Sequence, residues 1–146
     1  MNRVIEDIEV IKWTANNMHY ETRGVSFYQL HLLADRVKDF GSDVDDLKEK
    51  YYLGQNMTTP PRDVDIVRRA IDKYEKIIDN DDAANGDKFY LSALSSAFDF
   101  LIADVEAIKK DTTLYAGIHA ILDDISSRAL TYKFLVSSQY HNDAEV

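Results

Sequence analysis

Apolar residues that recur every three or four positions constrain this chain most strongly, because that spacing places them along one side of an α-helix. Four long stretches follow the pattern, and none shows the alternation that is typical of a β-strand. Only five glycines and two prolines interrupt the chain, and most breaks in the periodicity fall at one of them. The sequence therefore predicts an all-α fold built from four long helices.

The first predicted helix ends at Gly24. The second is predicted to run unbroken from a capping box at Ser26 and Gln29 to Gly54, about seven turns later. Consecutive prolines cannot continue a helix, so residues 54–61 are predicted to form a linker. The inward stripe of the first helix is Val4, Ile8, Ile11, Ala15, Met18 and Thr22. The stripe of the second is Leu30, Leu33, Val37, Phe40, Val44, Leu47 and Tyr51.

A shorter helix and two further long helices complete the prediction, with an acidic turn at residues 79–86 and a frayed tail at 140–146. Asp111 or Thr112 is predicted to cap the last helix. The short helix is predicted to turn inward Ile66, Val67, Ala70, Ile71, Tyr74, Ile77 and Ile78. The two long stripes are Phe89, Ala93, Ala97, Leu101, Val105 and Ile108, then Leu114, Ile118, Ile121, Ile125, Ala129, Tyr132 and Leu135. Together they predict one domain, 1–146, folded as a four-helix bundle with a short extra helix in its middle connection.

The composition excludes several classes of protein. The chain has 146 residues, of which 45% are hydrophobic and 29% charged, the profile of a folded domain that buries a core. It contains no cysteine, which excludes disulfides, thiolate metal sites and a cysteine nucleophile. No apolar run is long enough to span a membrane, and we expect a cytoplasmic protein. The net charge of −9, without a basic patch or arm, makes DNA binding unexpected.

Common catalytic motifs are also missing. The sequence has no P-loop, no dinucleotide fingerprint, no nucleophile elbow and no Glu-x-x-His pair of the kind that builds a di-iron centre inside a bundle. The core stripes are almost wholly apolar, so we expect no buried ligand set inside one subunit.

The polar face of the second helix carries the clearest candidate site. At about 100° per residue, Asp35, Asp46 and Glu49 all lie within about 60° of His31, opposite the apolar stripe. The pair His31 and Asp35 lies about 20 Å from the pair Asp46 and Glu49, too far to share a metal within one subunit. Antiparallel pairing of two copies would bring the pairs together twice, about an axis near residues 40–42. Periodicity alone favours the simpler interpretation, the solvent-facing side of a surface helix.

A local signature supports the metal site. The stretch from His19 to Asp35 resembles the signature of the Dps-type miniferritins: two histidines 12 residues apart, a glycine and a phenylalanine between them, and an aspartate one turn after the second. In that family these histidines and this aspartate bind iron at a dimer interface, and the partner supplies further carboxylates. The resemblance implies that His19, His31 and Asp35 are iron ligands, and that Asp46 is a ligand to the partner's site.

The resemblance also has departures. Lys50 falls where the family has a glutamate, and Glu49 is the candidate to replace it. Tyr20 replaces the usual tryptophan, and the basic tail of many DNA-condensing members is absent. An ammonium group at position 50 would repel a ferrous ion or take its place.

Two functions remain open. In the first, the protein is an iron-binding miniferritin that oxidises and stores ferrous iron, with no catalytic residue apart from the metal ligands. It would dimerise through the second helix, and whether twelve copies assemble stays open. In the second, it is a ferritin-like structural or interaction protein that has lost this chemistry. Lys50 is the residue that separates the two.

Overall fold

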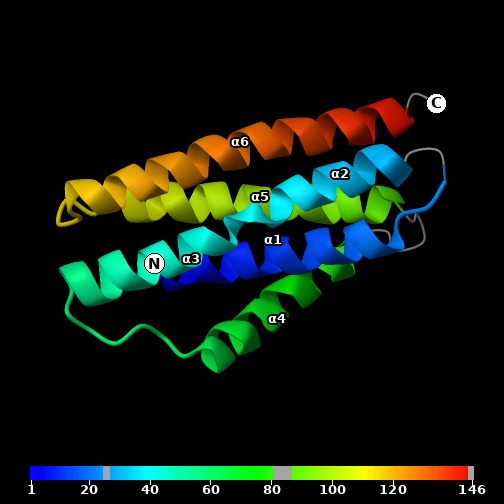
Figure 1. Ribbon diagram of the computed structural model, residues 1–146. Coiled ribbons are helices and arrows are strands. Elements are labelled where there is room, and N and C mark those ends of the chain that lie inside the picture. The colour runs from blue at the N-terminus through cyan, green and yellow to red at the C-terminus, as the bar shows by residue number, and fades with distance from the viewer. Residues whose placement is uncertain (25–26, 81–86, 145–146) are drawn as a thin grey trace.

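The computed structural model describes residues 1–24, 27–80 and 87–144, without the side chains of 78–80, 87 and 140–144. Every regular element within these ranges is a helix, which confirms the predicted all-α class (Figure 1). In chain order the elements are α1 (Asn2–Glu21), α2 (Phe27–Val37), η1 (Lys38–Phe40), α3 (Gly41–Leu47), η2 (Lys48–Gln55), α4 (Asp63–Asn80), α5 (Asp87–Lys109) and α6 (Ala116–Ala144). None of these described helices is both long and apolar enough to cross a membrane.

The long helices lie alongside one another, and α4 crosses them at an angle (Figure 1). Helix α1 packs against α2, α4 and α5, and α5 packs against α6. Helices α1 and α6 run in one direction, whereas the segment from α2 to η2 runs in the other, together with α5 (Figure 1). The stretch that links η2 to α5 must therefore cross the length of the molecule, and α4 is the helical part of that crossing.

The core lies between the long helices and follows the predicted stripes closely. The stripe residues of α1 are buried, and in the second segment burial continues from Leu30 to Leu47. The rings of Phe40, Phe98 and Tyr132 form the centre, with centroids 5.5 to 6.3 Å apart. Burial of side chains of this size contributes about 2 kcal/mol each, so this cluster is a main source of stability.

The second helix is not the unbroken α-helix that the sequence predicted. A 3₁₀ turn, η1, separates α2 from α3, and the last part, η2, is a π-helix. A π-helix bonds each carbonyl to the amide five residues later. Gly54 suits this winding, because a Cβ there would lie 3.3 Å from the carbonyl oxygen of Glu49. The side chain of Gln55 then ties η2 to the α5–α6 connection, donating to Thr113 O and accepting from Tyr115 N–H, each at 2.9 Å.

Helix α4 buries a narrower face than predicted. Ile66, Ala70 and Ile77 are buried, whereas Val67 and Ile71, predicted to face inward, are exposed. The reason is that α4 rests mainly on α1, and no helix of the described chain packs on its outer side (Figure 1). Its half-buried Tyr74 meets the ring of Trp13 edge-on at 6.3 Å.

The ends of α6 also differ from the prediction. Asp111 accepts a hydrogen bond from Thr113 N–H at 2.9 Å, but the helix begins only at Ala116, so neither Asp111 nor Thr112 caps it. At the other end helical backbone continues through the predicted frayed tail to Ala144. The proposed cap at Ser26, most of the acidic turn at 81–86, and residues 145–146 lie outside the described residues.

Candidate metal site

The connection between α1 and α2 brings the two signature histidines together. Thr22 ends α1 in an extended conformation, and Gly24 adopts a φ of +89°, which a side chain would disfavour. The guanidinium of Arg23 donates to the carbonyls of Tyr20 and Thr22 at 3.0 and 2.7 Å, which satisfies carbonyl groups at the end of the helix. Because the chain reverses here, α2 returns along α1 and its first turn lies beside the last turn of α1.

His19 and His31 stack ring on ring, with centroids 3.8 Å apart and planes 28° apart. The Nδ1 of His31 lies 3.1 Å from the backbone oxygen of His19. A carbonyl oxygen can only accept, so this contact assigns the proton of His31 to Nδ1 and leaves its Nε2 lone pair free in the neutral ring. A backbone acceptor of this kind is the usual means of orienting a metal-binding histidine.

Asp35 lies beside His19 and Lys38. Its Oδ1 lies 3.4 Å from His19 Nδ1 and 3.0 Å from the ammonium of Lys38. The hydrogen bond from Lys38 holds the pKa of Asp35 below its ordinary value, so the carboxylate is ionised at neutral pH. Two imidazoles and a carboxylate form a donor set that suits ferrous iron and zinc alike. Three of the five predicted site residues therefore lie together in one chain.

Asp46 and Glu49 are placed differently. The carboxylate of Asp46 pairs with the ammonium of Lys50 at 3.6 Å, and Glu49 is exposed. Glu49 and Lys50 both belong to the π-helical η2, whose wider turn places residues four and five positions apart above one another. Lys50 follows Asp46 at the ordinary i,i+4 spacing of helical neighbours, and its ammonium pairs with that carboxylate.

Within the part of the chain that the structure describes, no three His, Asp or Glu side chains are arranged to hold a metal ion. The stacked rings and Asp35 approach one another without surrounding a common point. A metal ion bound at these three side chains would therefore need further ligands from elsewhere.

No family model matches the chain. No curated protein and no solved structure matches it either. The roles of the site residues consequently depend on their own geometry and on the local signature.

The three residues at the predicted dimer axis, 40–42, differ in how far they are exposed at the surface. Phe40 is completely buried in the core, and a Cβ added to Gly41 would meet only the side chain of Lys12 in the same chain, at 3.7 Å. Ser42 is exposed. A contact between copies on this face would therefore centre on Ser42, and a side chain at Gly41 would point back towards α1.

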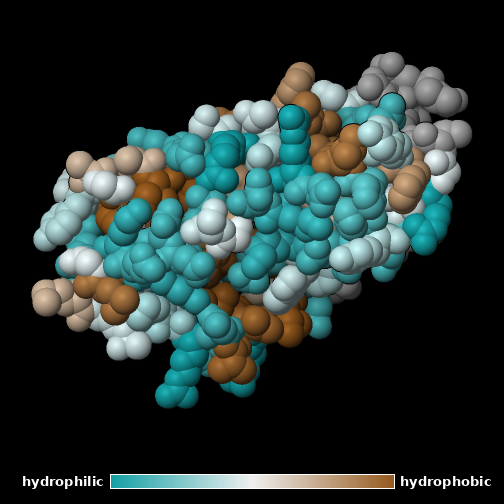
Figure 2. Space-filling model, in the orientation of Figure 1, coloured by the Kyte–Doolittle hydropathy of each residue, from teal (hydrophilic) through white to brown (hydrophobic). Residues whose placement is uncertain are grey.

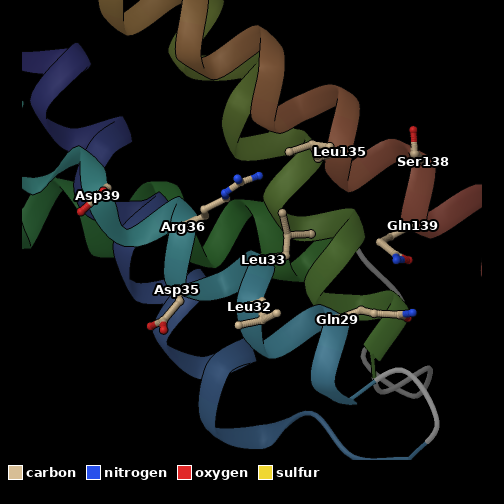
Figure 3. A pocket seen from close by; sticks show the side chains of 9 residues that line it. All are labelled: Gln29, Leu32, Leu33, Asp35, Arg36, Asp39, Leu135, Ser138 and Gln139. Atoms are coloured by element: carbon tan, nitrogen blue, oxygen red, sulfur yellow. The ribbon is translucent and has the colours of Figure 1, made fainter.

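A groove of about 790 Å³ separates α2 from α6 beside the candidate site (Figure 3). Leu33 and Leu135 face each other across it, and Arg36 extends towards α6 (Figure 3). Asp35 and Asp39 lie at the α2 edge, one turn apart. Among the residues that line the groove, Asp39 is a second carboxylate beside Asp35, and none is a histidine.

A buried ionic cluster is the main feature that the sequence prediction missed. Glu6 and Asp7 of α1 are buried, although the core was expected to be almost wholly apolar. The ammonium of Lys73 from α4 lies 2.5 Å from Asp7, and 3.7 Å from both Glu6 and Asp104 of α5. Arg69, also from α4, contacts Glu6 at 2.6 Å. The cluster joins three helices, and α4 provides its positive charges.

Burial, together with a hydrogen bond to Asp104, raises the pKa of Asp7 to about 8, although the nearby Lys73 lowers it. One sequence signal could have revealed the cluster. Ile5 and Val10 are apolar but lie outside the predicted stripe of the first helix. If they are buried as well, nearly the whole circumference of that helix is buried, and Glu6 and Asp7 are then buried with it. Arg69 and Lys73, one turn apart on α4, then match them in charge.

Proposed function

We propose that this protein is a ferritin-like four-helix bundle that binds ferrous iron between subunits, with His19, His31 and Asp35 as one subunit's ligands. The observation that carries the proposal is the convergence of these three side chains at the α1–α2 turn. The stretch resembles the miniferritin signature, and the imidazole and carboxylate donors suit both oxidation states of iron. These three ligands would form one half of a metal site, a half-site. A second copy of the chain would supply the other half, with Asp46 and a further carboxylate such as Glu49.

The chain topology supports the fold in this proposal. Ferritin-like bundles differ from simple up-and-down bundles by one long crossover, which makes their second and third long helices run in the same direction. The segment from α2 to η2 and helix α5 have this relation, and α4 lies in the connection between them (Figure 1). The four long helices would then be α1, α2–η2, α5 and α6.

In this proposal iron is the substrate of the site. His31 would offer Nε2 because its Nδ1 is held by the His19 carbonyl, and Asp35 would offer the oxygen now shared with Lys38. Where dioxygen is the oxidant, each ferrous ion gives up one electron to it, and the ferric product is stored as hydrated oxide.

A second function is favoured by the two lysines. Lys38 and Lys50 each neutralise a carboxylate that would otherwise bind the metal, Asp35 and Asp46 respectively. An ammonium group that replaces a metal ion can preserve the surface charge balance without the chemistry. In this alternative the protein keeps a ferritin-like bundle for assembly or for interaction with another protein, and binds no iron.

Anaerobic calorimetry with ferrous or zinc ions separates the two functions. We expect the parent protein to bind metal and His31→Ala to abolish binding, because one imidazole supplies much of a three-ligand half-site. Helix content should be unchanged, since His31 is only half-buried and lies off the core stripe. We expect Lys50→Glu to strengthen binding, because it removes the cation beside Asp46 and adds a carboxylate.

Lys110→Glu is the matched control, because it makes the same charge change at an exposed position after α5. It should leave the affinity unchanged. A parent protein that binds neither ion, together with a Lys50→Glu variant that binds neither, would eliminate the iron-binding proposal and leave the structural one.

A further inference from the structure

The outer face of α4 carries an apolar stripe that no part of the described chain covers. Val64, Val67 and Ile71 have 57%, 37% and 43% of their surfaces exposed. The space-filling view shows a hydrophobic patch in the region of this helix (Figure 2). With Tyr74 these three residues follow a spacing of three, four and three residues, which is the seam spacing of helices that pair with other helices. A groove of about 440 Å³ beside Val67, bordered by α1 and α3, extends the same surface.

The charges beside the stripe indicate which partner fits it. Arg68 and Glu75 lie two turns apart on one flank, at about 40° and 20° from Val64 around the helix axis. Both side chains are exposed, and neither has an ion-pair partner among the described residues. The adjacent Arg69 differs, because it points inward to Glu6. The flank thus carries one positive and one negative side chain that form no ion pair among the described residues.

From these observations we infer that α4 pairs with α4 of a second copy of this chain, antiparallel, about an axis beside Ile71. In an antiparallel helix pair the same flanks of the two helices face each other. Arg68 of each copy then faces Glu75 of the other, which gives two complementary contacts from one self-complementary surface. A parallel pair would place this flank against the opposite one, where Ala70 and Ile77 are buried and supply no charge.

This contact is made by α4, which contributes none of the candidate metal ligands, and it does not depend on iron. Its apolar area is small compared with that of obligate dimers, so we expect a concentration-dependent dimer. The helix stands out from the rest of the molecule, which leaves room for a second α4 to approach (Figure 1).

Charge reversal followed by mixing tests the pairing directly. Arg68→Glu gives one copy two negative flank charges, and Glu75→Arg gives it two positive ones, so each variant should repel itself. We expect each to weaken the dimer by about tenfold in metal-free sedimentation velocity at low salt. An equimolar mixture of the two variants should recover the parent's dimer, since every Glu then faces an Arg.

Arg62→Glu is the control, because it makes the same charge change at an exposed position just before α4, on the other side of the helix axis. It should leave the dimer unchanged. Recovery on mixing also shows that both variants are folded. A monomeric parent at about 200 µM, variants that dimerise like the parent, or a mixture that stays monomeric would each overturn the inference. A metal-dependent dimer that both variants retain would point instead to the α2–α3 face.

Discussion

Replacement of Asp7 by asparagine should stabilise the protein, and increasingly so as the pH rises. Asp7 is fully buried, and its pKa of about 8 exceeds the ordinary value of 3.8. The folded chain therefore binds this proton more tightly than the unfolded chain does. The stability that the fold gains from this tighter proton binding is fully present below about pH 4, and it is lost as the pH rises towards 8. Asparagine resembles the protonated form, because it can accept from Lys73 and donate to Asp104.

The size of the effect follows from the same two pKa values. Each pH unit between them corresponds to about 1.4 kcal/mol, so ionised Asp7 destabilises the fold by up to about 6 kcal/mol above pH 8. Water entering the cluster would reduce this figure, and we expect a measured gain of about 2 to 4 kcal/mol for Asp7→Asn at pH 8. Near pH 4 the variant and the parent should have nearly equal free energies of unfolding.

Urea unfolding followed by circular dichroism at pH 4 to 9 measures this difference. Asp43→Asn is the informative comparison, because Asp43 is also buried but pairs with the guanidinium of Arg128 at 2.5 Å. Removing that charge leaves Arg128 poorly compensated and should destabilise the protein by about 1 to 3 kcal/mol. If Asp7→Asn destabilised the protein at pH 8 as Asp43→Asn does, Asp7 would be an ionised partner of Lys73, and the reasoning would fail.

Two further predictions concern the surface. Gly41→Ala should raise the free energy of unfolding, measured in urea, by about 0.5 to 1 kcal/mol, because Gly41 has helical backbone angles and a new methyl group would meet the side chain of Lys12. Light scattering should show an unchanged assembly. A smaller assembly would mean that Gly41 does lie at the dimer axis. DNA binding should be negligible in gel shifts at about 150 mM salt, because the net charge is −9; tight binding there would reveal a basic surface created by assembly.

The sequence was sufficient to predict the helices because burial on one face leaves a regular mark on the chain. The stripes from Val4 to Met18 and from Leu30 to Leu47 are buried as predicted. Periodicity was less informative where winding changes. It assumes a constant 100° per residue, and so missed the 3₁₀ turn at Lys38–Phe40 and the π-helix at Lys48–Gln55. Those two changes shift the positions of the residues that follow them around the helix axis.

Periodicity also treats every apolar residue as buried and every charge as exposed. It therefore assigned Val67 and Ile71 to the core, although among the described helices α4 packs mainly against α1. It overlooked Glu6 and Asp7, which enter the core only because α4 supplies Lys73 and Arg69 from about 65 residues away. At the candidate site, the 12-residue spacing was enough to bring His19 to His31, because α2 begins only a few residues after α1 ends. The ion pair between Lys38 and Asp35 depends on rotamers, which the spacing does not specify.

Lys38 offers a further test of whether the half-site serves metal. Its ammonium lies 3.0 Å from the oxygen of Asp35 that also faces His19, so a bound cation must displace it or share that oxygen. An exposed pair of this kind contributes little, so we expect its removal to change the affinity by at most about fivefold. Lys38→Met should strengthen zinc binding by up to that factor and reduce its dependence on salt. Lys12→Met, which removes an ammonium paired with Glu9 on α1, is the control and should change neither. Weaker zinc binding by Lys38→Met would mean that Lys38 positions Asp35 for the metal rather than competing with it.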